Sequence, residues 1–131
     1  MSRFLTLIPL VAAGCVTTST VAYRPSAEQP RMSLAEGQVT LRTFLGMECA
    51  RLREAGIAGA TVPVTVALDA EGNVTEAELE RSTGDSRADG VVGAVAAQLR
   101  LEPTASGRAM LRGGYRCGDD GGVDVTLERA T

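Results

Sequence analysis

The stretch VPVTVALDAEGNVTEAELERSTGDSRADGVVGAVAAQLRLEP, from Val62 to Pro103, encodes a strand, a turn, a second strand and a helix in that order. The apolar residues of its first part share one parity: Val62, Val64, Val66 and Leu68. This period of two predicts a strand with one buried face. Gly72 can supply the positive φ of a hairpin loop between Asp69 and Asn73. The second strand carries Glu76, Glu78 and Glu80 on one face, so we expect that face to meet solvent.

A helix is expected from about Arg87 to Leu99, after a cap at Asp85 or Ser86. Its apolar residues recur at helical spacing: Ala88, Val91, Val92, Val95 and Leu99. Gly90 and Gly93 each lower helix stability by about 1 kcal/mol relative to alanine, unless they permit close packing on the sheet. Pro103 prevents any helical continuation.

Three further elements are expected on either side of this stretch. Apolar residues at three- and four-residue steps predict a helix from Val39 to Ala55, with Thr40 as its cap and Gly56 at its end. Arg108 to Cys117 is a predicted third strand, with a bulge at Gly113-Gly114. The glycine-rich segment 118–122 predicts a turn into a last strand from Val123 to Glu128.

Composition limits the class of protein. The chain has 131 residues, enough for one domain, and only 3% of them are aromatic. The net charge is −3, all 13 basic residues are arginine, and no basic cluster stands out. We therefore expect no nucleic-acid partner.

The first fourteen residues have the layout of a secretory signal peptide, with Arg3, a short apolar run and small residues before Cys15. The string VAAGC resembles the lipobox of bacterial lipoproteins, which implies cleavage before Cys15, acylation of that cysteine and, with Val16 next, outer-membrane sorting. The alternative is a secreted protein in which Cys15 has no such role. Residues 15–38 are expected to be a tether on the periplasmic side of the envelope, and residues 39–131 a folded domain.

Cys49 and Cys117 remain once Cys15 is assigned to the lipid. In an exported domain two cysteines are expected to form a disulfide, because the compartment is oxidising. Two free buried thiols are the alternative.

Segment 48–107 resembles the C-terminal domain of TonB-type energy transducers. The residues that carry the resemblance are Asp69, Gly72, Val74, Ser82, Gly84, Asp85, Asp89, Arg100, Leu101 and Pro103, after the lead-in Gly56-Ile57-Ala58-Gly59. It implies an α+β fold: a small antiparallel sheet of three to four strands with two helices packed on one face. This sequence has Leu99 and Leu101 where the family carries aromatic residues beside the arginine.

The resemblance also implies a function. Family members bind an extended segment of outer-membrane transporters by strand addition. Here it places the partner-binding edge on the third strand, with Arg108, Met110, Arg112 and Tyr115, and we expect the C-terminal strand to cover that edge. The chain is therefore expected to be a lipid-anchored, non-enzymatic protein-binding module for outer-membrane or periplasmic proteins, and not an energy transducer. The alternative is a structural envelope lipoprotein that binds no such peptide.

Catalysis, cofactors and metals have little support in the sequence. The chain has no histidine, which excludes Ser-His and Cys-His arrangements. We expect Asp85 and Asp89 to be a helix cap and a first-turn acid rather than an acid–base pair. Asp119 and Asp120 are expected to form a turn rather than a calcium site.

Overall fold

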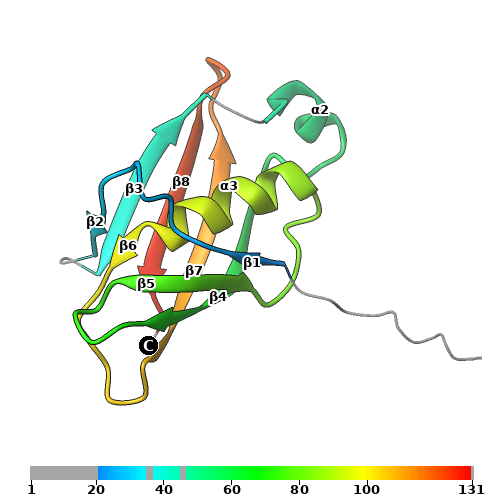
Figure 1. Cartoon of the computed structure of the whole chain (residues 1–131). Coiled ribbons are helices and arrows are strands. Elements are labelled where there is room, and N and C mark those ends of the chain that lie inside the picture. The colour runs from blue at the N-terminus through cyan, green and yellow to red at the C-terminus, as the bar shows by residue number, and fades with distance from the viewer. Residues whose placement is uncertain (1–20, 35–36, 45–46, 131) are drawn as a thin grey trace, which may run out of the picture.

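In a computed structural model that describes residues 21–34, 37–44 and 47–130, a long twisted sheet carries one helix across one of its faces (Figure 1). The helices are α2 (Cys49–Glu54) and α3 (Ser86–Ala97). The strands are β1 (Ala22–Tyr23), β2 (Met32–Ser33), β3 (Gln38–Thr43), β4 (Gly59–Leu68), β5 (Val74–Leu79), β6 (Leu99–Arg100), β7 (Arg108–Cys117) and β8 (Val123–Arg129).

The main sheet has six strands in the order β1-β5-β4-β7-β8-β3, all paired antiparallel. The β4–β5 hairpin forms as predicted, with Gly72 at φ 89° and the amide of Asp69 donating to the carbonyl of Asn73 at 2.9 Å. The β7–β8 hairpin is also confirmed. A separate two-stranded parallel sheet joins β2 to β6.

The core lies between the sheet and α3. Alternate residues of the central strands face the helix and are buried: Val62, Val64, Val66, Leu111, Val125 and Leu127. Gly113 lies among them, because a Cβ there would come within 3.0 Å of Leu127, Val64 and Val92. The expected bulge at Gly113-Gly114 is absent, since the register of β7 with both neighbours is continuous there. Glycine is needed at Gly113 for close packing of the helix.

The opposite face of the sheet is polar, and no helix of the described residues covers it (Figure 1). The hydroxyls of Thr40 and Thr126 lie 3.1 Å apart across β3 and β8, and Arg112 pairs with Glu128 at 3.5 Å. The three glutamates expected to meet solvent belong to this side, where Glu76 pairs with Arg24 and Glu80 accepts from Thr65. We call this surface the open face.

The expected fold class is wrong. A sheet of three to four strands with two helices on one face was predicted, whereas the structure is mostly β, with six strands in the main sheet and two more in the second. The expected helix from Val39 to Ala55 is β3 followed by the six-residue α2. Pairing with β8 along Gln38–Thr43 satisfies the backbone of this segment across the sheet, so the local helical spacing does not decide its structure.

The folded unit also begins earlier than residue 39. β1 pairs with β5, and β2 pairs with β6, both inside the segment expected to be a tether. Arg31 holds the connection between them by donating to the carbonyls of Val74, Ala97 and Leu99 at 2.7–3.3 Å. The buried Gln98 amide donates to the carbonyls of Gln29 and Pro30 at 3.2 and 3.3 Å. Part of the expected tether is therefore packed on the end of α3.

Candidate functional site

β1 and β3 are the two edge strands of the main sheet, and β3 is the longer of them. In the register with β8, Thr40 lies opposite Thr126 and Leu41 opposite Val125. The amide of Arg129 donates to the carbonyl of Gly37 at 3.0 Å, so the odd-numbered residues of β3 direct their backbone groups toward β8. The N–H and C=O groups of Gln38, Thr40 and Arg42 therefore point outward. Within the described residues, no strand pairs with this side of β3.

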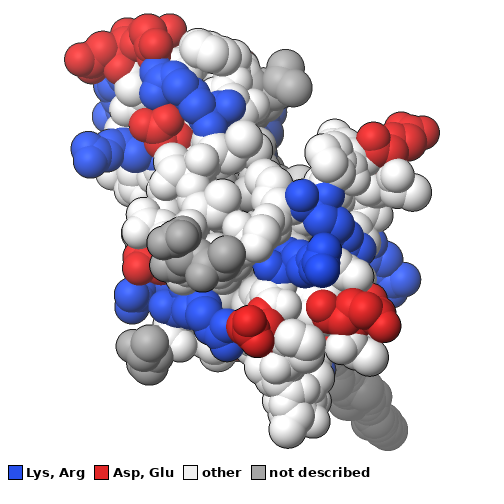
Figure 2. All heavy atoms as spheres, turned by 90° about the vertical axis from the view of Figure 1, so that its left-hand side faces the viewer, with Lys and Arg blue, Asp and Glu red and all other residues white. Residues whose placement is uncertain are grey.

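A groove of about 580 Å³ lies between β3 and α3, directly beside this edge. On the helix side it is lined by residues of α3 that lie three or four positions apart and so share one face of the helix: Arg87, Gly90, Val91, Ala94 and Val95. On the strand side it is lined by Thr43 and by Leu41, a residue that is 38% exposed. Figure 2 looks onto this side of the molecule and shows uncharged surface between groups of arginine and acidic side chains. An open strand edge beside an apolar groove is an arrangement that can accept an extended peptide.

The two glycines of α3 have different environments. A Cβ on Gly93 would lie 2.5 Å from two atoms of the Tyr23 ring, so this glycine lets β1 approach the helix. A Cβ on Gly90 would meet nothing within 4 Å. The expectation that glycines permit close packing therefore holds for Gly93, whereas Gly90 leaves space at the groove.

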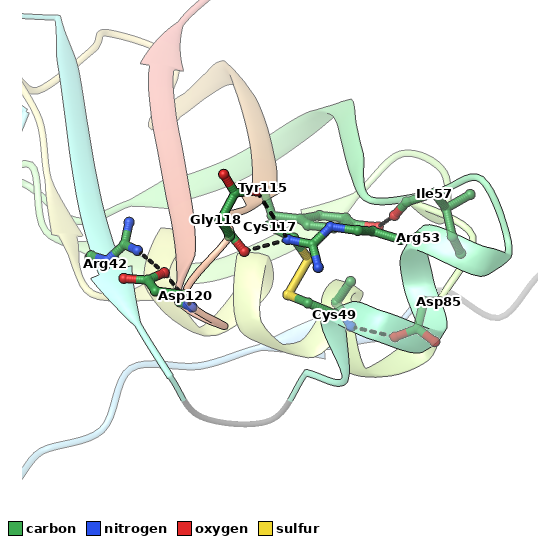
Figure 3. Close-up of a disulfide and its surroundings, with 12 residues drawn as sticks. Arg42, Cys49, Arg53, Ile57, Asp85, Tyr115, Cys117, Gly118 and Asp120 are labelled. Carbon is green, nitrogen blue, oxygen red and sulfur yellow. Dashed lines mark hydrogen bonds and ion pairs between the residues drawn. A yellow bond between two sulfur atoms is a disulfide. The ribbon is translucent and has the colours of Figure 1, made fainter.

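Arg42 fixes β3 to the turn between β7 and β8. Its guanidinium donates to Asp124 at 2.9 Å and to Asp120 (Figure 3). It lies directly over Gly122, where a Cβ would be 2.6 Å from its Nη2 atom. Hydrogen bonds from the amide of Gly122 and from Arg42 lower the pKa of Asp120. As expected, Asp120 serves the turn, and its partner is an arginine.

A disulfide connects α2 to the end of β7 (Figure 3). It joins Cys49 to Cys117, the expected pair, whose Cα atoms are 5.8 Å apart and so lie within the range for a disulfide. Beside it, Arg53 donates to the carbonyl of Gly118, and Leu52 is fully buried. The disulfide and these contacts hold the short α2 against the same turn that Arg42 binds from β3.

The predicted partner-binding residues do not form an edge. β7 is paired with β4 from Arg108 to Arg116 and with β8 from Leu111 to Cys117, so most of it is interior to the sheet. Arg108, Met110 and Arg112 lie on the open face, whereas Tyr115 is buried on the helix side and donates to the carbonyl of Ile57. The C-terminal strand covers β7 as expected, but β3 then covers β8. The alternation within β7 already separates Tyr115 from the other three residues.

The carboxylates at the start of α3 are structural, as expected. Asp85 caps the helix by accepting from the amide of Ala88 at 3.0 Å, and it also accepts from Arg51 at 2.9 Å. These hydrogen bonds, with that from Arg51 the stronger, lower the pKa of Asp85. Asp89 accepts from the amide of Thr83 at 2.7 Å and from the hydroxyl of Ser82 at 2.6 Å. Burial, and then the charges of Asp85 and Asp89, raise the pKa of the nearby Tyr115.

Other sites can be described briefly. Among the residues that the structure describes, no group of three or more histidine, cysteine or acidic side chains is placed to hold a metal ion. None of the helices in that part of the chain is long and apolar enough to cross a membrane. Cys15, the expected lipid site, lies outside the described residues.

The sequence does not predict the β3 edge, because residues 39–43 are expected to begin a helix and Gln38 to end the tether. The alternation of Val39, Leu41 and Thr43 is the local signal that favours a strand there. Comparison of the chain with family models, with curated proteins and with solved structures finds no match to any of them.

Proposed function

We propose that the protein is an exported, lipid-anchored and non-enzymatic protein-binding module, which binds its partner by strand addition at the outer edge of β3. The observation that carries the proposal is the outward direction of the backbone groups of Gln38, Thr40 and Arg42, next to the groove under α3. An added strand would bond to these groups, which supplies affinity independent of sequence. Its alternate side chains would enter the groove, which supplies selectivity.

The groove favours a particular pattern in the added strand. Among the described residues that line it, one is charged, Arg87, which pairs with Glu48 at 3.1 Å, and none carries a carboxylate. Leu41, Val91 and Ala94 offer apolar surface. The added strand therefore carries apolar residues at every second position on the side of α3, and polar residues on the open face.

The membrane part of the proposal rests on the sequence. Acylation at Cys15 would attach the chain to the envelope, and the first described residues continue into β1, at the opposite edge of the sheet from β3. The described chain thus begins at the edge of the sheet opposite the proposed binding edge. Outer-membrane or periplasmic proteins are the proposed partners, and the chain is not itself an energy transducer in this proposal.

A structural envelope lipoprotein is the second candidate. Its support is that β7, the strand that the resemblance assigns to transporter peptides, is paired on both sides from Leu111 to Arg116. A peptide therefore has no strand edge to bind along this part of β7. In this candidate the sheet has a mechanical role and β3 binds no other protein.

Site-specific photo-crosslinking in native envelopes separates the candidates. A crosslinking amino acid at Gln38, exposed on the β3 edge, should capture a protein. The matched control is the same amino acid at Thr61, exposed on the interior strand β4. Capture from position 38 alone supports binding at the edge, whereas capture from neither position, or from Thr61 alone, would contradict it.

A further inference from the structure

The sequence of β3 has the same alternation of apolar and polar residues that its edge favours in an added strand. Val39 packs against the core and Leu41 lines the groove, so the odd-numbered side chains lie on the side of α3. Thr40 and Arg42 contact Thr126 and Asp124 on the open face. β3 is therefore itself a strand with apolar residues toward α3 and polar residues on the other side, which is the pattern that the groove favours.

Hydrogen bonding selects one register for two copies of β3. The apolar faces of the two β3 strands lie on the same side of the joined sheet only when even-numbered residues lie opposite even-numbered residues. A shift of one residue would move every side chain to the other face. Pairing centred on Thr40 places Gln38 opposite Arg42 of the second copy and Thr40 opposite Thr40. All the outward-facing residues then form hydrogen-bonded pairs, whereas a shift of two residues in either direction leaves one of them unpaired within β3.

Charge and apolar contact agree with the same register. Arg42 meets the uncharged Gln38 of the second copy, whereas a register centred on Arg42 would oppose two guanidinium groups. On the side of α3, Val39 of one copy lies opposite Leu41 of the other. This contact would cover Leu41, which is 38% exposed in the single chain, and would extend over the mouth of the groove.

We propose that the protein forms a two-fold symmetric dimer in which the β3 strands of two copies pair antiparallel about Thr40 and join their sheets into one. This inference rests on the proposed function, because it identifies a second copy as the partner that adds a strand at the β3 edge. The contact is isologous, with the same residues contributed by both copies, so it closes at two chains. It also removes the free edge, which would otherwise invite uncontrolled pairing.

Disulfide trapping tests the register directly. In the mature chain, Thr40→Cys places a thiol on the two-fold axis, where Cα atoms of a hydrogen-bonded pair are about 5.5 Å apart, within the range for a disulfide. Mild oxidation should convert most of this variant to a linked dimer. Gln38→Cys is the matched control, because its two copies would lie about 14 Å apart, four residues along the strand. The unsubstituted chain is a second control, because any dimer linked in it under the same oxidation must arise from its own cysteines.

The outcomes separate the dimer from the proposed function. Rapid linkage of Thr40→Cys, slow linkage of Gln38→Cys, and linkage in a mixture of Gln38→Cys with Arg42→Cys would support the dimer. Equal linkage of Thr40→Cys and Gln38→Cys, or a monomeric mass for the unsubstituted chain with no linkage, would overturn it. If that monomer still captures another protein from position 38 in envelopes, the edge function stands without the dimer. If it captures nothing, both proposals fail.

Discussion

The two glycines of α3 provide a matched pair of substitutions with opposite expected effects on stability. Gly90→Ala adds a methyl group where nothing lies within 4 Å. Alanine stabilises a helix interior by about 1 kcal/mol relative to glycine. We therefore expect Gly90→Ala to raise the free energy of unfolding by about 1 kcal/mol.

Gly93→Ala gains the same helix propensity but meets the ring of Tyr23, with two ring atoms 2.5 Å from the added Cβ. Overpacking of this kind costs about 1–3 kcal/mol. The net effect is a loss of up to about 2 kcal/mol, so the two variants should differ by about 1–3 kcal/mol. Tyr23 belongs to the two-residue β1, which the clash would displace from the sheet edge.

Urea unfolding of both variants, with the disulfide intact, measures this difference as a change in midpoint at constant m. A double-mutant cycle identifies the cause: in a Tyr23→Ala background, Gly93→Ala should become as favourable as Gly90→Ala. The reasoning is refuted if Gly93→Ala is as stable as Gly90→Ala in the native background, or if removal of the Tyr23 ring leaves its effect unchanged.

Three further changes test other parts of the structure. Replacing Cys49 and Cys117 together with serine should lower the free energy of unfolding by about 4 kcal/mol, the chain-entropy value for a sequence separation of 68 residues; unchanged stability would show that the bridge does not form. The hydrogen bonds from Arg51 and Ala88 that lower the folded-state pKa of Asp85 stabilise the protein above about pH 4, and this stabilisation is lost as the pH falls through that pKa. Asp85→Asn should therefore lose less stability than the native chain between about pH 5 and pH 2, and an equal loss in both would count against this role. Cys15→Ser should release the protein in soluble form, and an unmodified mature N-terminus elsewhere would contradict acylation at Cys15.

The local sequence pattern is sufficient to predict several elements of the fold. The alternation from Val62 to Leu68, the loop at Gly72 and the cap at Asp85 all appear in the structure. β7 has the predicted bounds, and β8 ends one residue later than predicted. The partners within the β4–β5 and β7–β8 hairpins are close in the chain, so short-range signals specify these two pairings.

The remaining parts depend on contacts between residues far apart in sequence. Leu41 and Phe44 have a spacing that suits a helix, but pairing of β3 with β8, 80 to 90 residues later in the chain, makes this segment a strand. β1 and β2 are two residues long and carry no periodic signal, and Arg31 and Gln98 hold their connection to α3. The sheet therefore has more strands than predicted, and the expected binding edge on β7 is interior.

Amide hydrogen exchange within β3, followed over a range of protein concentrations, tests the central claim most directly. The amides of Val39 and Leu41 face β8 and should be protected at every concentration. Those of Gln38, Thr40 and Arg42 face outward and should exchange rapidly in dilute solution, then become protected as a second copy adds its strand. Rapid exchange of these three amides at all concentrations, or protection that arises instead at β1, would contradict the assignment of the β3 edge as the pairing surface.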